Sequence, residues 1–288
     1  MNNGCICCTV RGDLIRILGK LLRRRDKFDH ILIETTGLAD PGPVIQTFFA
    51  DEDLKRSLIV DSVVTLVDAK HVLLHIDDSR EVKEQIAFAD IILLNKIDLV
   101  PENEAAALEK RVQGINRLAK IYRTRDAGVD LNKILNVGAF DLDRIMEIEP
   151  AFLKAEHEHH HHSHDGDEHE CGPDCQHHEH HHDEHHDHEH DASIQSVGIE
   201  YEGEVNGDKL NQWISELLKT KGPDIFRMKG IFSIKGQPNR LIFQGVHMML
   251  DAKPEMDSKG KARKNSLIFI GRNLDREELN GGFKACLA

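Results

Sequence analysis

A run of histidine and acidic residues divides this chain into two parts. From His157 to His190 almost every residue is His, Asp or Glu, and the segment holds 16 of the 20 histidines of the chain. Because the segment lacks the apolar side chains that a core needs, we expect a disordered insert. The sequence therefore predicts a first domain at residues 1–150, an insert at 151–193 and a second domain at 194–288.

The insert also has the chemistry of a metal-binding segment. Neutral imidazole is a common ligand of zinc, copper, nickel and cobalt, and neighbouring acids raise the local cation concentration. We interpret the insert as a low-selectivity metal reservoir, with a purely solubilising linker as the alternative. Its internal position and interspersed acids argue against a purification tag. The candidate ligands are Cys171, Cys175, His159, His160, His161 and His162.

A second group of soft ligands lies near the start of the chain. Cys5, Cys7 and Cys8 account for three of the six cysteines. Thiols this close in sequence rarely meet the geometry of a disulfide, so we interpret them as ligands for Zn²⁺ or Co²⁺. A buried, unreactive cysteine patch is the alternative.

Hydrophobic patterning in the first domain predicts alternating strands and helices. The expected strands are 30–33, 62–68, 91–94 and 120–123, and the expected helices are 10–22, 81–89, 102–118 and 131–135. Pro43 suits the first turn of another helix. This alternation predicts an α/β fold with a parallel sheet covered by helices on both faces.

An acid and a glycine follow the first expected strand, in the sequence Glu34-Thr35-Thr36-Gly37. The arrangement resembles the Walker-B and switch region of a P-loop NTPase. The acid there reaches a Mg²⁺-bound water, and the glycine lets the backbone approach a γ-phosphate. Many α/β strands end in an acid, so this signal alone is weak.

The strand at 91–94 runs directly into Asn95-Lys96-Ile97-Asp98. This N-K-x-D pattern is typical of a guanine site. The carboxylate of Asp98 accepts from two guanine donors that adenine lacks, Asn95 faces the N7 edge, and Lys96 lies along the base or stabilises the loop. A solvated turn is the alternative, although the position suits the ligand crevice of a doubly wound sheet.

Residues 194–288 predict a smaller α+β domain with one four-stranded sheet. The strands are expected at 194–201, 225–234, 241–249 and 266–271, and the helices at 209–220 and 276–286. Asn206 is the expected N-cap of the first helix. We interpret His247 as a hydrogen-bonded strand residue, with a metal ligand as the alternative, and Trp213 and Cys286 as structural.

The ordered motifs and this C-terminal domain make the chain similar to the CobW-like family of P-loop GTPases, which includes zinc-regulated GTPase metalloprotein activators and metallochaperones. The resemblance implies a metal on the thiolates of the C-x-C-C motif, Mg²⁺ near Glu34, and guanine at the N-K-x-D motif. It assigns the catalytic roles to Glu34 and Gly37. It further implies that GTP binding assembles the metal site and that hydrolysis drives metal transfer to a client metalloenzyme.

One family motif is missing. No G-x-x-x-x-G-K-[ST] phosphate loop occurs in the sequence, since Gly12, Gly19 and Lys20 have the wrong spacing. We therefore expect an N-terminally truncated family member, with a P-loop NTPase-like sheet that is incomplete at its N-terminus. The leading hypothesis is a GTP-hydrolysing zinc or cobalt metallochaperone. The alternative is a non-catalytic metal-binding or buffering protein without nucleotide turnover.

Composition excludes some other functions. A formal net charge of −13 argues against nucleic-acid binding. No apolar run approaches the roughly 18 residues of a membrane helix. Six cysteines without a secretory leader favour the cytoplasm, although truncation would also remove an organellar targeting peptide. A homodimer is compatible with the sequence.

Overall fold

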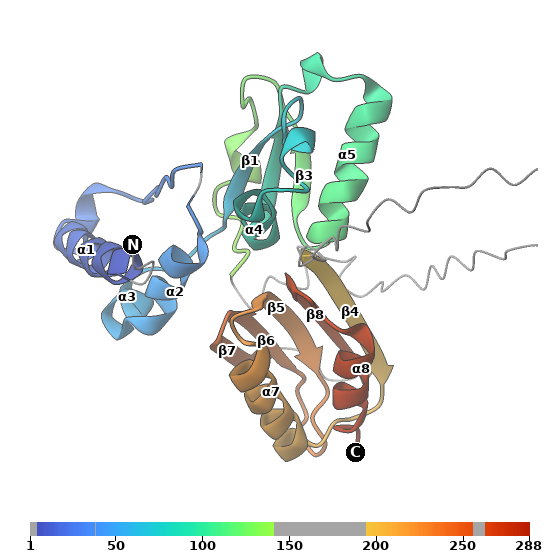
Figure 1. Cartoon of the computed structure of the whole chain (residues 1–288). Coiled ribbons are helices and arrows are strands. Elements are labelled where there is room, and N and C mark those ends of the chain that lie inside the picture. Colours follow the sequence, from blue (N-terminus) through green and yellow to red (C-terminus); the bar gives the residue numbers. More distant parts are fainter. Residues whose placement is uncertain (1–4, 38, 141–193, 256–262) are drawn as a thin grey trace, which may run out of the picture.

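The computed structural model describes residues 5–37, 39–140, 194–255 and 263–288, which form a helical layer and two sheets (Figure 1). The first sheet is parallel, in the order β1 (Val64–Asp68), β2 (Ile91–Asn95), β3 (Lys120–Arg123). The second is antiparallel, in the order β4 (Ile194–Glu202), β8 (Lys264–Arg272), β5 (Ile225–Phe232), β6 (Leu241–Val246), β7 (Met249–Pro254). The His-rich insert lies outside the described residues.

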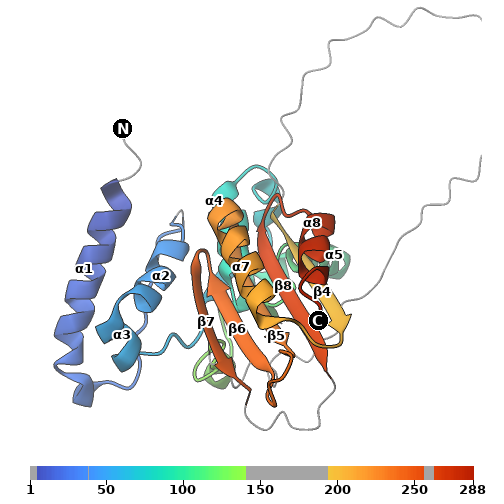
Figure 2. The ribbon, with the colours of Figure 1, turned by 90° about the horizontal axis from the view of Figure 1, so that it is seen from below.

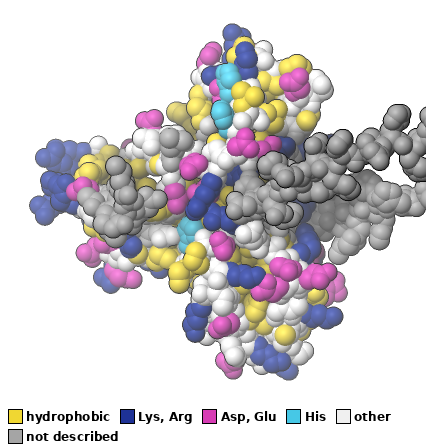
Figure 3. All heavy atoms as spheres, in the orientation of Figure 1, with side chains coloured by type: hydrophobic (Ala, Val, Ile, Leu, Met, Phe, Trp, Pro, Cys, Tyr) yellow, Lys and Arg dark blue, Asp and Glu magenta, His cyan; other side chains and the backbone are white. Residues whose placement is uncertain are grey.

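Three helices form a layer that stands to one side of both sheets (Figures 1 and 2). They are α1 (Cys5–Leu22), α2 (Gly42–Ala50) and α3 (Glu52–Ser57). Helix α1 packs against the other two, and its Leu18 is buried. The exposed run 23–25, all arginine, follows its last residue, where cations complement the helix dipole (Figure 3). Pro43 lies in the first turn of α2, as predicted.

Helices α4 (Arg80–Phe88) and α5 (Glu102–Ile115) follow β1 and β2 and pack on the parallel sheet. Their apolar side chains share one core with those of the sheet. This core contains Val67, Ile92 and Leu94 of the sheet, Ile86, Ala87 and Phe88 of α4, and Leu108, Val112 and Ile115 of α5. The predicted βαβ alternation is therefore confirmed for this part of the chain. None of the described helices is long and apolar enough to cross a membrane.

We expected helices to cover both faces of the sheet, and within the described residues this prediction is wrong at β1. Val64 and Leu66 point away from the α4–α5 side and are 41% and 58% exposed. The expected strand 30–33 is also wrong, because that segment forms no strand and its Leu32 is 92% exposed. A strand needs a hydrogen-bonded neighbour, and this segment pairs with none of the described strands. The helix expected at 131–135 is only a 3₁₀ turn, Leu131–Lys133.

The second sheet packs helices α7 (Gly207–Lys221) and α8 (Arg276–Lys284) against its apolar core. Asn206 caps α7 by accepting hydrogen bonds from two backbone N–H groups, as predicted. The expected number of strands was wrong, since the sheet has five. The chain turns sharply at His247, whose φ is +51°, and returns as the half-exposed edge strand β7. The strand position expected for His247 is therefore wrong, because His247 and Met248 form the turn, and neither is the Gly or Asn that is typical of such turns.

A buried carboxylate joins the two sheets. Asp90, between α4 and β2, accepts from Arg227 Nη1 at 2.6 Å, and Lys229 Nζ lies 3.7 Å away. The other oxygen of Asp90 accepts the backbone N–H of Val63 at 2.8 Å. Arg227 also donates to the carbonyl of Phe88. All three charged side chains are at most 3% exposed, so each charge is stabilised by the others rather than by water.

Other contacts extend this junction along α4. The buried carboxylate of Glu84 pairs with Arg272 of β8 at 2.7 Å and with Arg80 at 2.6 Å. The ring of His247 lies against Phe88 of α4 and Phe226 of β5, with centroid distances of 5.3 and 5.7 Å. Burial there lowers the pKa of His247, which favours its neutral form.

Asp90→Asn tests this junction. The substitution keeps the shape of the side chain but leaves the buried charges of Arg227 and Lys229 without their carboxylate. We expect the free energy of unfolding in urea to fall by about 3–5 kcal/mol. Glu102→Gln, in the exposed pair with Arg123, is the matched control and should cost less than about 1 kcal/mol. Equal losses in the two variants would contradict a special role for Asp90.

Candidate functional site

The cysteine motif lies in the first turn of α1, not ahead of it. The helix begins at Cys5 and continues without a break through Cys7 and Cys8. The side chains of these residues lie outside the described part of the structure, as do Cys171, Cys175 and His159 to His162. Among the side chains that the structure describes, no three His, Cys, Asp or Glu residues form a metal-binding group.

The Glu34–Gly37 segment is exposed and lies between the arginine run and α2 in the sequence. Its contact with the parallel-sheet part of the chain is through α4, where Gln85 Nε2 donates to the carbonyls of Gly37 and Ala39 at 2.9 and 3.1 Å. The backbone of Gln85 in turn accepts the hydroxyl of Thr65 in β1. One glutamine therefore holds the end of this segment to α4.

The Asn95-Lys96-Ile97-Asp98 turn lies at the carboxyl end of β2, where the sequence predicts it. Asn95 is almost fully buried, and its Oδ1 accepts from Thr124 Oγ1 at 3.1 Å and from the Ala127 N–H at 2.9 Å. These bonds fix the amide so that its NH₂ group remains the donor. The carboxylate of Asp98 is 37% exposed, with Arg125 Nε 3.7 Å away. The turn thus presents one fixed donor and one accessible acceptor.

Lys96 has a left-handed backbone conformation, with φ at +61°, which a side chain with a Cβ seldom adopts. Its ammonium bonds Asp68 Oδ2 at 2.7 Å, across the neighbouring strand end. Burial would raise the pKa of Asp68, but the hydrogen bonds from Lys96 and His71 outweigh that effect and hold the pKa far below its usual range. Asp68 is therefore a carboxylate throughout the physiological pH range.

Sequence reasoning missed the third part of this site, the turn that follows β3. Thr124 is buried, and Asp126 and Ala127 both have positive φ values. The hydrogen bonds from Thr124 and Ala127 to Asn95 bring this turn beside the N-K-x-D turn at the same edge of the sheet. The signal in the sequence is the Asp-Ala-Gly run at 126–128 directly after a strand, which is typical of a tight turn.

The structure brings together only some of the predicted site residues. Asn95, Lys96 and Asp98 share one edge of the parallel sheet with Asp68 and the turn at 124–127. Within the described ranges, no hydrogen bond or ion pair joins Glu34 to that edge. The layer that contains the cysteine motif also stands apart from it (Figure 1).

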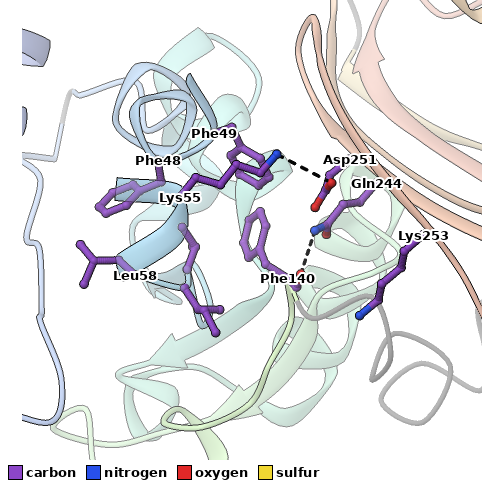
Figure 4. A pocket seen from close by; sticks show the side chains of 10 residues that line it. Phe48, Phe49, Lys55, Leu58, Phe140, Gln244, Asp251 and Lys253 are labelled. Atoms are coloured by element: carbon purple, nitrogen blue, oxygen red, sulfur yellow. Dashed lines mark hydrogen bonds and ion pairs between the residues drawn. The ribbon is translucent and has the colours of Figure 1, made fainter. Parts of the chain in front are cut away.

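A separate cavity of about 370 Å³ lies between the α2–α3 segment and strands β6 and β7 (Figure 4). Phe49 and Phe140 form part of its apolar wall, and Lys55 and Asp251 face each other across it at 3.9 Å. None of the predicted metal or nucleotide residues lines this cavity. It contributes nothing to the site at the sheet edge.

The role of Gln85 can be measured directly. In Gln85→Leu, both hydrogen bonds to the segment ahead of α2 are lost. We therefore expect exchange of the Ala39 N–H, which bonds the carbonyl of Thr36, to accelerate about tenfold while the unfolding free energy changes by less than about 1.5 kcal/mol. Gln113→Leu, at an exposed position on α5, is the control and should leave exchange of the Ala39 N–H unchanged. Unchanged exchange in Gln85→Leu would show that other contacts hold the segment.

Comparisons with known proteins agree with this architecture. Residues 1–123 match the model of the CobW/HypB/UreG nucleotide-binding domain, and residues 194–287 match the cobalamin synthesis protein cobW C-terminal domain. The zinc chaperone YjiA of Escherichia coli is 31% identical, with 98% of this chain and 80% of YjiA covered. The zinc-regulated GTPase metalloprotein activator 1 of Schizosaccharomyces pombe is 33% identical over 96% of this chain and 68% of its own length.

A solved structure shows the same fold. The crystal structure of Zn(II)-bound YjiA GTPase from Escherichia coli superposes with a TM-score of 0.72 at 28% identity, covering 96% of this chain and 76% of that one. Two family models in the expected order, relatives that align over nearly the whole chain and a shared fold lead to one conclusion. This chain belongs to the CobW/HypB/UreG family.

Proposed function

We propose that this chain is a guanine-nucleotide-dependent zinc chaperone that carries Zn²⁺ on Cys5, Cys7 and Cys8 and delivers it to a client metalloenzyme. The observation that carries the nucleotide half is the geometry of the N-K-x-D turn. Asn95 is held with its NH₂ free to donate, and Asp98 is an accessible acceptor a few residues away. This pair complements the acceptors and donors of guanine and mismatches adenine.

The residues fit the base of the nucleotide better than its phosphates. Glu34, the residue that the family resemblance places near Mg²⁺, lies in an exposed segment away from the sheet edge. The sequence also has no G-x-x-x-x-G-K-[ST] cradle. We therefore derive no magnesium-dependent step from this conformation. Within the proposal, Asn95 and Asp98 select the base, and Gln85 holds the segment that contains the expected switch glycine, Gly37.

The metal half of the proposal depends on the backbone at the start of α1. In a helix, residues i and i+3 are neighbours, whereas i and i+2 lie on nearly opposite sides. A single ion bound by all three thiolates of the motif therefore requires a non-helical first turn. The names of the relatives support zinc as the cargo, since they are a zinc chaperone and a zinc-regulated activator. Zinc also suits thiolate ligands.

A second candidate, non-catalytic metal binding or buffering, is favoured by the missing phosphate-loop motif. GTP hydrolysis measured with and without Zn²⁺ separates the two candidates. A zinc-stimulated rate above the buffer background supports the chaperone with turnover. No hydrolysis, together with intact zinc binding, supports the buffering protein.

Nucleotide selectivity tests the base site. The full chain should bind GDP in preference to ADP, and Asp98→Ala should weaken GDP binding by about 10–100-fold, because a charged hydrogen-bond acceptor contributes roughly 1.5–3 kcal/mol. Calorimetric titration gives both constants. Glu104→Gln, on the exposed side of α5, should bind like the wild type. A wild-type chain that binds GDP and ADP equally, or neither, would rule out guanine recognition.

Zinc titration against a competing chelator tests the metal site. Cys7→Ser should weaken the highest-affinity zinc site at least about tenfold, whereas deletion of residues 157–190 should lower the stoichiometry and leave that affinity intact. Zinc should also alter amide exchange at residues 5–10 in the wild type and in the deletion variant, but not in Cys7→Ser. Equal losses of affinity in the two variants would contradict a dedicated thiolate site.

A further inference from the structure

The two carboxylate oxygens of Asp68 have different partners. Oδ1 accepts the backbone N–H groups of Lys70 and His71, at 3.0 and 3.2 Å, and so closes the turn that follows β1. Oδ2 accepts from Lys96 Nζ at 2.7 Å and bonds the ring Nδ1 of His71 at 3.0 Å. One oxygen therefore serves the local turn, and the other reaches the N-K-x-D turn of the next strand.

The position of Asp68 in the sheet brings its carboxylate close to the Lys96 side chain. Asp68 pairs in register with Asn95, and the N–H of Ala69 donates to the carbonyl of Asn95 at 2.9 Å. The residue after Asn95 is Lys96, whose φ is positive. Its side chain extends from the end of β2 back to the end of β1, so the aliphatic stem crosses the edge of the sheet between the two strands.

We propose that Asp68 is a positioning residue of the guanine site, which fixes the Lys96 side chain as a preformed platform for the base. This inference rests on the proposed nucleotide function and adds a residue outside the N-K-x-D motif to it. A base held by Asn95 and Asp98 packs on the anchored lysine stem. Because the lysine is already ordered, less conformational entropy is lost on binding.

The charge balance supports the same role. An unpaired ammonium beside the donor side of the site would favour any anionic group over a neutral base. Pairing with Asp68 neutralises that charge and leaves the apolar stem as the contacting surface. The ion pair also stabilises the left-handed backbone conformation of Lys96. The position of Asp98 depends on that conformation.

Asp68→Asn separates the proposed role from a purely structural one. The amide oxygen of Asn still accepts the backbone N–H groups that close the local turn, but its NH₂ group cannot accept from the Lys96 ammonium. We expect GDP affinity to fall about tenfold, which corresponds to about 1.4 kcal/mol. Lys96→Met should show a similar loss, and the double variant should lose no more than Lys96→Met alone. Asp77→Asn, which removes the exposed pair with Arg111, is the control and should bind GDP normally.

Amide exchange gives a readout that does not need a nucleotide. In Asp68→Asn the N–H groups of Ile97 and Leu99, which bond Thr124 and Lys96, should exchange about tenfold faster than in the wild type while the unfolding midpoint is unchanged. A GDP affinity within twofold of the wild type, or losses that multiply in the double variant, would overturn the proposal, as would unchanged exchange. A wild-type chain that binds no GDP refutes the proposed function itself, and with it the guanine role of Asp68.

Discussion

The arrangement of this molecule depends on one buried charge, the carboxylate of Asp90. It accepts from Arg227 of the antiparallel sheet and from the N–H of Val63 just ahead of the parallel sheet, so a single side chain sets the position of one sheet against the other. Removing ions from water is costly, and the cost is recovered only when the geometry is satisfied. A displaced packing of the two sheets would leave these charges unmatched, which makes the observed packing specific.

Helix α4 is the element through which distant parts of the chain meet. Its Glu84 pairs with Arg272 of the second sheet, and the next residue, Gln85, holds the segment that ends at Gly37. Its last residue, Phe88, lies against the ring of His247 in the turn between β6 and β7. Because these contacts come from one short helix, the segment ahead of α2 and the C-terminal sheet share a single rigid support.

The sequence predicted those elements whose own residues show the pattern of a buried strand or of a known turn. β2 reads as a continuous apolar run because both of its faces are covered, and the N-K-x-D turn follows from the residue types alone. The strand expected at 30–33 failed because an apolar pattern cannot show whether a neighbouring strand is present to pair with it. β7 was missed because its half-exposed pattern and the turn at His247 have no local signal, and the turn at 124–127 became visible only through its contacts to Asn95.

Helix α1 runs through Cys5, Cys7 and Cys8, so its helical conformation competes with zinc binding by these thiolates. If the metal-binding backbone is non-helical, the apparent affinity for zinc equals the intrinsic affinity multiplied by the fraction of molecules in which the first turn is open. A first turn that is open about one time in a hundred would weaken binding about a hundredfold without any change of ligand. Metal capture and release are then adjustable through the stability of a single helical turn, and a partner that binds this end of α1 would change the affinity for zinc without touching the ion.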